Sequence, residues 1–413
     1  MMNEPGKIVA ALDIGTSKTV CLIGRVDEAG KVAIIGYGVS GYRSKSVHRG
    51  VLIRMASTED AVLNACEKAQ AMANVTIDSV YVGVSGAHLE CATSEGTVTF
   101  ENSQVNEEDI ARVMAQGSIR TDPVGKELLH VLPQEFVIDD SSGIQDPLGM
   151  TGSRMQVKTL LVFADKNALN DLRNCVANCG LKLSGFVARQ LASSLAVVNE
   201  DEKDLGVAMV DIGAGTSDIA IYTGGAIRYI ETLPIAGDHL TSDLSISLIT
   251  PSDEAEKLKC KYGCTMASLV DAEDEIKVAS VGKRPPRAMQ RQTLAEVLGP
   301  RYEELFEYVS DAFERSGCKD KLLSGVILTG GSAQMEGAIE LAAEMFQRKV
   351  SVALPIGLSE FDSALQHPSF STAVGLLHWG ANEKGPSAGR SQASQHVAQK
   401  TKESLWDKVK RSF

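Results

Sequence analysis

The sequence contains no run of about eighteen consecutive apolar residues, the minimum length of a membrane-spanning helix. Its first residues, Met1–Lys7, are polar and lack the apolar segment of a secretory signal peptide. We therefore expect no transmembrane segment, and we expect the protein to stay in the cytoplasm.

Positive charge is in deficit, because 41 Lys and Arg residues stand against 53 Asp and Glu residues, giving a net charge of −12. A surface with this balance repels nucleic-acid phosphates and anionic membranes. We therefore expect no nucleic-acid partner, and any membrane contact requires a local patch of opposite sign.

The eight cysteines form no clear metal-binding pattern. Two pairs, Cys175/Cys179 and Cys260/Cys264, have helical i,i+4 spacing, but neither has a His or Cys neighbour at the usual zinc-ligand spacing. Reduced structural thiols are the favoured interpretation, and a metal site is the alternative.

An internal repeat is the first positive signal in this chain of 413 residues, which is too long for one ordinary core. Ile8–Ile23 and Val207–Tyr222 each read as an apolar strand, an Asp-Ile-Gly turn and a second strand. Two such units predict two related α/β domains.

The residues of these two turns suit phosphate. Backbone amides of a glycine turn form an anion-binding nest, the hydroxyls of Thr16, Ser17 and Thr216 add donors, and Lys18 adds charge. The Asp of each turn ends a buried strand, where it can hold magnesium through the metal's water shell. Two such hairpins facing each other would grip a triphosphate from both sides.

A third glycine turn follows later in the chain. The strand Gly325–Thr329 runs into Gly330-Gly331-Ser332 and then into an amphipathic helix through Phe346. A turn without side chains lets the backbone approach a base or ribose closely. Each motif alone also marks ordinary tight turns, but three in this order indicate a nucleotide site.

A small α+β insertion separates the two units. Short strands are expected at 96–100, 128–132 and 157–163, around a helix that Asn106 caps, with Asp109 at its third position and Ile110, Val113 and Met114 on one face. A helix at 166–179 follows, with Leu169, Leu172 and Val176 on one face and Gly180 ending it. After the second unit we expect a charged helix at 252–261.

The C-terminal segment supplies the missing positive patch. Residues 381–400 are rich in Gly, Ser, Ala and Gln and read as a flexible linker. From Lys400 onward five basic and two acidic residues give a net charge of +3. As a helix, the segment has an apolar arc formed by Leu405, Trp406, Val409 and Phe413. The basic residues lie mostly outside this arc, among them Lys408, Lys410 and Arg411. This pattern is typical of a helix on an anionic bilayer, and docking on its own domain is the alternative.

The order of the three glycine turns resembles the actin, DnaK-type chaperone and sugar kinase superfamily. Within this superfamily, the sequence resembles the bacterial FtsA cell-division family over nearly the whole chain. The supporting stretches are Val39–Ile53, Tyr81–Gly86, Ser280–Arg287, Arg301–Tyr302 and Ser371–Leu377. The resemblance implies an α/β, actin-like fold of two related RNase H-like domains, with nucleotide in the cleft and a small α+β inserted subdomain.

The resemblance also implies how the chain divides into domains. The divisions are 1–83 with 163–195 and 347–380 for the first domain, 84–162 for the inserted subdomain, 196–228 with 301–346 for the second domain core, 229–300 for its outer subdomain, 381–398 for the linker and 399–413 for the membrane helix.

The resemblance also assigns the nucleotide site, with ATP and Mg²⁺ as cofactors. The cofactor-binding residues are expected to be Gly15, Thr16, Ser17, Lys18, Gly213, Gly215, Thr216, Asp218, Gly237, Asp238, Glu256, Lys259, Gly330, Gly331 and Ser332. Asp13 and Asp211 are expected to face magnesium through water. For Glu256 and Lys259 a solvated, charged helix face is the alternative.

Two departures from the superfamily pattern bear on catalysis. Ala214 stands where relatives often have Gly, which is tolerable unless the residue needs a positive φ. Arg189-Gln190 stands where relatives commonly place Glu or Gln to position the attacking water. Gln190 and Asp211 are the candidates for a catalytic role, but Arg189 is no general base. We therefore expect nucleotide binding and at most weak ATP hydrolysis.

The resemblance implies a cell-division adaptor. Its partners would be other copies of the chain in actin-like filaments, the C-terminal tail of the tubulin-like protein FtsZ near Arg287 and Arg301, later division proteins on the inserted subdomain, and anionic lipid at the inner membrane of the septum. Ordinary surface charge is the alternative for both arginines.

A phosphotransferase such as a sugar kinase is the second hypothesis, although no further carboxylate base can be nominated. A pilus-assembly adaptor is the third, but it gives no reason for the C-terminal helix.

Overall fold

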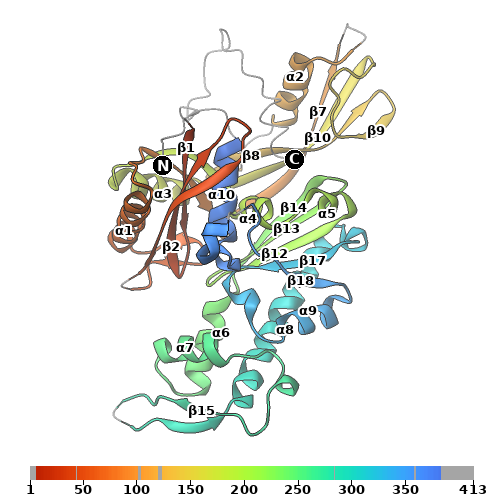
Figure 1. The fold of residues 1–413 in the computed structure, drawn as a ribbon. Coiled ribbons are helices and arrows are strands. Elements are labelled where there is room, and N and C mark those ends of the chain that lie inside the picture. The colour runs from red at the N-terminus through yellow and green to blue at the C-terminus, as the bar shows by residue number, and fades with distance from the viewer. Residues whose placement is uncertain are drawn as a thin grey trace.

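The computed structural model describes residues 6–42, 44–100, 104–119, 123–282, 284–357 and 360–382. Two five-stranded mixed sheets form its centre, with a smaller antiparallel sheet at one end and a helical unit at the other (Figure 1). None of the helices within these ranges is both long and apolar enough to span a bilayer.

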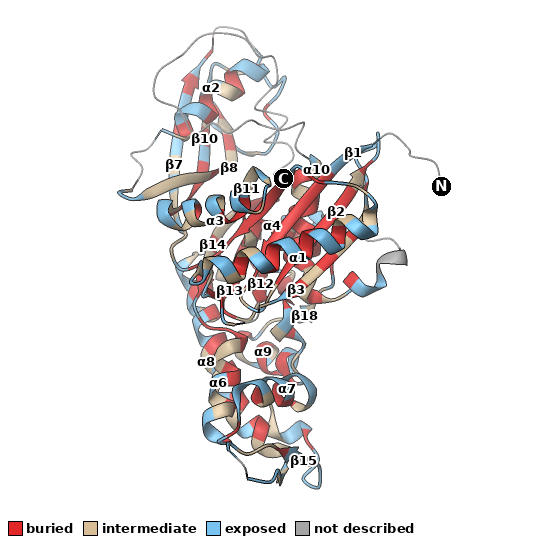
Figure 2. Cartoon of the chain, turned by 90° about the vertical axis from the view of Figure 1, so that its left-hand side faces the viewer, coloured by how far each residue is buried: buried red, intermediate tan, exposed pale blue. Residues whose placement is uncertain are grey.

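The first sheet has the order β11-β6-β1-β2-β3. The three strands β1, β2 and β3 form antiparallel pairs, whereas β6 and β11 run parallel to β1. The bounds are β1 Lys7–Ile14, β2 Lys18–Val26, β3 Val32–Gly41, β6 Ser79–Val84 and β11 Lys182–Ala188. Helix α1 (Met55–Ala73) covers one face, and Figure 2 shows the strands buried beneath it.

The second sheet repeats this topology. Its order is β14-β13-β12-β17-β18, with antiparallel pairs among β12, β13 and β14 and parallel pairs from β12 to β17 and β18. The bounds are β12 Val207–Ile212, β13 Ser217–Thr223, β14 Ala226–Leu233, β17 Gly325–Thr329 and β18 Val350–Val352. The predicted pair of related α/β units is therefore present, built on the two Asp-Ile-Gly hairpins.

Two helices join the sheets. Helices α4 (Arg189–Val197) and α10 (Ser371–Asn382) pack against each other between the two sheets (Figure 1). Their buried side chains form one apolar cluster with strand residues of both sheets, such as Val9 of β1 and Val207 of β12. This shared core fixes the position of one hairpin relative to the other.

The inserted sheet has the order β7-β10-β8-β9 and packs on α2. As predicted, Asn106 caps α2 (Glu107–Gly117) in a reciprocal capping box with Asp109. The remaining bounds here are β7 Glu90–Thr99, β8 Lys126–Ile138, β9 Ser141–Ile144 and β10 Arg154–Asp165, followed by α3 Lys166–Asn178 and Gly180 at φ 76°.

The other end of the molecule is mainly helical. It contains α6, α7, the short strands β15 and β16 and the start of α8 (Figure 1). The bounds are α6 Gly237–Ser247, α7 Ser252–Tyr262, β15 Glu275–Val278, β16 Arg287–Gln290 and α8 Gln292–Arg315. Smaller elements are β4 Val47–His48, β5 Val51–Leu52, α5 Glu200–Leu205, α9 Ala338–Phe346, and the 3₁₀ turns η1 Ala267–Leu269, η2 Lys319–Lys321, η3 Gly331–Gln334, η4 Glu360–Leu365 and η5 Pro368–Phe370.

Three details differ from the sequence-based picture. The predicted boundaries 228/229 and 300/301 fall within β14 and α8, and β18 joins the second sheet although 347–380 was assigned to the first domain. The third glycine turn leads into η3 before α9 begins, because Gly337 at φ 81° interrupts the helical path. The domain boundaries themselves remain predictions.

Candidate functional site

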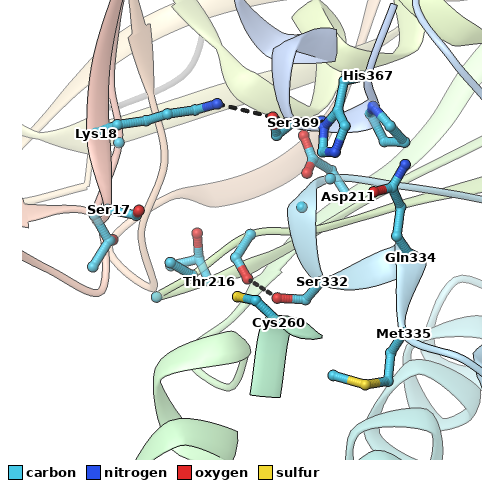
Figure 3. Close-up of a pocket in the computed structure, with 18 of the residues that line it drawn as sticks. Ser17, Lys18, Asp211, Thr216, Cys260, Ser332, Gln334, Met335, His367 and Ser369 are labelled. Carbon is cyan, nitrogen blue, oxygen red and sulfur yellow. Dashed lines mark hydrogen bonds between the residues drawn. The ribbon is translucent and has the colours of Figure 1, made fainter. Parts of the chain in front are cut away.

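A cavity of about 570 Å³ lies where the hairpin turns, η3, α7 and η5 converge (Figure 3). It brings together residues that the sequence places up to several hundred positions apart. The predicted residues that line it are Asp13, Gly15, Thr16, Ser17, Lys18, Asp211, Gly213, Gly215, Thr216, Glu256, Lys259, Gly330, Gly331 and Ser332.

The two hairpin turns have the same geometry. The amide of Gly15 donates to the carbonyl of Lys18 at 3.0 Å, and the amide of Gly213 donates to the carbonyl of Thr216 at 3.0 Å. No glycine in either turn has a positive φ, and neither has Ala214. Ala214 is therefore unstrained, and these turns select small residues for the space around them and not for a left-handed backbone.

Close approach of the two turns explains Gly215. A Cβ at this position would lie 2.4 Å from Oγ1 of Thr16, far inside van der Waals contact. The two turns therefore face each other, as predicted, and each presents backbone amides and hydroxyls to the same space.

Gly330 forms the third wall of the cavity. Its φ is +89°, and a Cβ there would lie 2.3 Å from Oδ1 of Asp211 and 2.5 Å from the carbonyl oxygen of Ile212. Ser332 then donates through Oγ to the carbonyl of Gly213 at 2.9 Å, which ties η3 to the second turn (Figure 3). The backbone of the third turn is thus held against the second.

The two aspartates that end β1 and β12 have different partners. Asp211 accepts hydrogen bonds on Oδ2 from Ser193 at 2.6 Å and Thr372 at 3.0 Å, and burial raises its pKa. Asp13 instead accepts a hydrogen bond on Oδ1 from Nη2 of Arg189, at 2.6 Å. Both aspartates line the cavity.

Asp218 does not line the cavity, although the sequence placed it among the nucleotide contacts. Its carboxylate accepts from Oγ of Ser85 at 2.8 Å, Nε2 of Gln190 at 3.0 Å and Oγ1 of Thr232 at 2.7 Å. Burial raises the pKa of Asp218 to about 6, partly offset by the positive charge of Arg189 and by the hydrogen bonds from Thr232 and Ser85. These three donors, from different parts of the chain, turn the carboxylate away from the cavity.

Gln190 lies behind the site. Its side chain is fully buried, and Nε2 also donates to Oγ1 of Thr232 at 2.6 Å. It is absent from the cavity lining, so the geometry does not place it to orient a water in the cleft. Sequence position alone suggested that role, but the ion-dipole contact with Asp218 holds the amide elsewhere.

Lys259 is buried and not part of a solvated helix face. Its Nζ donates to the carbonyl of Gly237 at 3.0 Å, to Oγ1 of Thr241 at 2.8 Å and to Glu256 at 2.7 Å. Glu256 is about half exposed, and the positive charge of Lys259 holds its pKa below the usual value against the opposing effect of burial. The pair therefore fixes α7 against α6 at the cavity wall.

Gly237 and Asp238 begin α6 and lie beside the cavity lining. Their amides donate to the carbonyls of Gly213 and Ala214, at 3.2 and 2.6 Å, so they support the second turn from outside. Asp238 also forms an ion pair with Lys45 at 2.9 Å, a residue of the first half of the chain. These two predicted residues are supports of the turn.

Sequence reasoning missed the segment around η5. Lys18 Nζ donates to Oγ of Ser369 at 2.8 Å (Figure 3). The same Nζ lies 3.9 Å from the centre of the ring of Phe370. No local motif marks this segment; only the neighbouring stretch from Ser371 carried a resemblance. The other lining residues outside the prediction are Arg189, Ala214, Cys260, Lys261, Gly263, Gln334, Met335, Glu336, His367, Pro368 and Thr372.

The two predicted partner arginines differ in their surroundings. Arg301 forms ion pairs with Asp243, at 2.7 Å, and with Glu304. Arg287 donates to the carbonyl of Leu248 and to Oγ of Ser280, and it forms no ion pair among those found in the described chain. The predicted membrane residues Leu405, Trp406, Lys408, Val409, Lys410, Arg411 and Phe413 lie outside the described residues.

Comparison with known proteins gives matches along the chain. The family model of cell division protein FtsA matches residues 208–375, and that of the SHS2 domain inserted in FtsA matches residues 86–163. Cell division protein FtsA of Pseudomonas aeruginosa is 41% identical over 409 residues, covering 99% of this chain and 98% of the relative. That of Escherichia coli K12 is 40% identical over 382 residues, covering 91% and 90%.

Solved structures show the same fold at low identity. A PilM–PilN type IV pilus biogenesis complex matches with TM-score 0.64 and 16% identity, covering 92% of this chain and all of that one. MreB5 of Spiroplasma citri bound to ADP matches with TM-score 0.55 and 14% identity, covering 89% and 94%.

The fold is therefore actin-like, with two related α/β domains and an inserted subdomain. The near full-length relatives settle the family. This chain belongs to the FtsA family of cell division proteins.

Proposed function

We propose that the chain is an ATP-binding adaptor of cell division, which assembles with itself at the inner face of the cytoplasmic membrane at the septum. It anchors the FtsZ ring through its C-terminal helix and recruits later division proteins. The observation that carries the ATP-binding part of the proposal is the contact between the two turns at Thr16 and Gly215, which makes one cavity of about 570 Å³ from two halves of the molecule.

ATP fits the donors that line this space. Backbone amides of both turns, the hydroxyls of Thr16 and Thr216 and the ammonium of Lys18 suit phosphate oxygens. The left-handed backbone at Gly330 leaves room for the adenosine between η3 and α7. The MreB5 neighbour of the same fold is described as bound to ADP, which agrees with this placement.

Filament assembly and membrane attachment are tested together by electron microscopy of the full chain with ATP on vesicles containing anionic lipid. We expect filaments on the vesicles and few in the absence of lipid or ATP. Absence of filaments with both present would contradict the assembly proposal.

The role of residues 399–413 is tested by their removal. The truncated chain should lose co-sedimentation with anionic vesicles and keep ATP binding, because the basic amphipathic segment supplies the lipid contact. One helix binds weakly, so attachment depends on several copies in one assembly. Undiminished sedimentation would contradict this role.

The FtsZ contact is proposed around Arg287 of the outer subdomain. Three large apolar side chains close to it in the fold are well exposed, Ile246 at 73%, Ile249 at 65% and Val281 at 53%. Within the described residues Arg287 has no ion-pair partner, unlike Arg301, and its charge suits an acidic, partly apolar peptide.

A peptide of the FtsZ C-terminal tail tests this surface by titration. Arg287→Glu should weaken binding by about tenfold, or ~1.4 kcal/mol. Lys257→Glu, on the exposed face of α7 in the same subdomain, is the matched control and should bind normally. Equal binding by both variants would remove Arg287 from the contact.

The inserted subdomain is proposed to serve filament contacts and later division partners.

A further inference from the structure

Arg189 lies beside Asp13, one of the two aspartates that the sequence assigned to a magnesium ion. It starts α4, lines the cavity and contacts Asp13, and the two side chains are only 15% and 7% exposed. An arginine stays protonated throughout the physiological range. A fixed positive charge is therefore built into the cleft.

Three buried carboxylates surround this charge. Asp13, Asp211 and Asp218 all interact favourably with Arg189 and raise its pKa against the effect of burial. Arg189 likewise lowers the pKa of Asp211 and Asp218 relative to burial alone. The positive charge that these carboxylates require thus comes from the chain.

The predicted magnesium site fits this arrangement poorly. Magnesium keeps several waters in near-octahedral order, and the carboxylate oxygens that hold those waters must be free to accept their hydrogen bonds. Oδ1 of Asp13 is engaged by the guanidinium, and Oδ2 of Asp211 accepts two hydroxyl hydrogen bonds. A guanidinium beside Asp13 also repels a divalent cation at short range.

We propose that Arg189 takes the charge-neutralising place of a divalent cation, so that this chain binds the phosphates of ATP without magnesium. The proposal rests on the function proposed above. Nε of Arg189 is buried without an acceptor among the described residues, but the side chain lines the cavity and its hydrogen bond to Asp13 uses Nη2, so Nη1 remains for a phosphate oxygen. Arginine suits this contact because its planar donors match phosphate geometry.

The test is calorimetric titration of the full chain with ATP, in excess EDTA and in excess magnesium. The wild-type dissociation constant should differ by less than about threefold between EDTA and magnesium. This is well below a tenfold difference, which corresponds to ~1.4 kcal/mol. Arg189→Gln should lose more than about tenfold in EDTA and regain most of this with magnesium. Arg173→Gln, which breaks an ion pair with Glu127 remote from the cavity, is the matched control and should behave as wild type.

A second variant covers the case in which Arg189→Gln does not fold, since it leaves Asp13 buried without its cation. The double variant Asp13→Asn/Arg189→Gln removes both charges and should show the same loss of binding in EDTA. Magnesium-dependent binding by the wild type, or undiminished binding in EDTA by either variant, would overturn the inference. Absence of wild-type ATP binding under both conditions would instead overturn the proposed function.

Discussion

The two Asp-Ile-Gly hairpins share one backbone design but carry different chemistry. In each, a glycine amide closes the turn by the same 3.0 Å hydrogen bond. In the first hairpin Asp13 pairs with a cation, whereas in the second Asp211 accepts hydrogen bonds from the hydroxyls of Ser193 and Thr372. Ser17 of the first turn is exposed, and its counterpart Gly215 is buried against Thr16. The repeat therefore fixes the backbone of both hairpins. Packing from α4, α10 and η5 decides which contacts the side chains of each hairpin make.

The largest effect should come from filling the contact between the turns. Gly215→Val places a branched side chain where even a Cβ meets Oγ1 of Thr16 at 2.4 Å, so the turns must separate. ATP affinity should fall by about a hundredfold or more, or ~2.7 kcal/mol. Ser17→Val, the same change at the exposed counterpart, should lose less than about tenfold.

Calorimetry measures both variants, with circular dichroism confirming that each is folded. Equal losses would show that the two turns are equivalent and would break the comparison.

The second prediction concerns Asp218, whose counterpart in the first hairpin is the apolar Val20. Asp218→Ala leaves Ser85, Gln190 and Thr232 without their buried acceptor and should cost about 2 kcal/mol of unfolding free energy. Urea denaturation measures it.

The pH dependence of this loss has a definite sign. The folded pKa of Asp218 is about 6, above its ordinary value, so the folded state holds a proton that the unfolded state has lost between about pH 4 and 6. Its contribution to stability is therefore largest below pH 4 and falls as the pH rises to 6. The wild-type advantage over Asp218→Ala should shrink across this range, whereas the advantage over Val20→Ala should show no such trend. A wild-type advantage over Asp218→Ala that grows from pH 4 to 6 would contradict the raised pKa of Asp218.

Much of the fold follows from local patterns. The paired hairpins, the Asn106 cap and the strand before Gly330 are each set by residues close in sequence, and each is found. The contact from Lys18 to Ser369 spans 351 residues and depends on how the two sheets meet, so no local pattern predicts it. The sequence indicated that Asp218 contacts the nucleotide, whereas the structure directs its carboxylate away from the cavity. The reason is the same, because hydrogen-bond partners from three other segments set the direction of this carboxylate.

A third, smaller effect should follow from Lys18, which has no charged counterpart in the second turn. Its ammonium is partly buried, and burial lowers its pKa while Asp13 opposes this. Lys18→Gln should weaken ATP binding by about tenfold, with Thr216→Ala losing less. A titration at low and at high salt checks it, because the lysine contribution is electrostatic. An unchanged affinity at low salt would remove Lys18 from the phosphate contacts.

The smallest effect should come from contacts between the β4–β5 region and α6. Lys45 pairs with Asp238 at 2.9 Å, and Arg49 Nη2 lies 3.0 Å from Nε2 of His239. The double variant Lys45→Gln/Arg49→Gln should reduce ATP affinity by only about twofold, since such exposed pairs contribute ~0–1 kcal/mol. A loss as large as that of Lys18→Gln would show that closure of the two halves, and not the turns, dominates binding.

The central claim is that both turns hold one nucleotide. A crystal structure of the full chain with a non-hydrolysable ATP analogue tests it most directly. The account predicts phosphates between residues 15–18 and 213–216, with adenosine beside Gly330–Ser332. Phosphates bound to one turn alone, or a nucleotide bound outside this cavity, would contradict it.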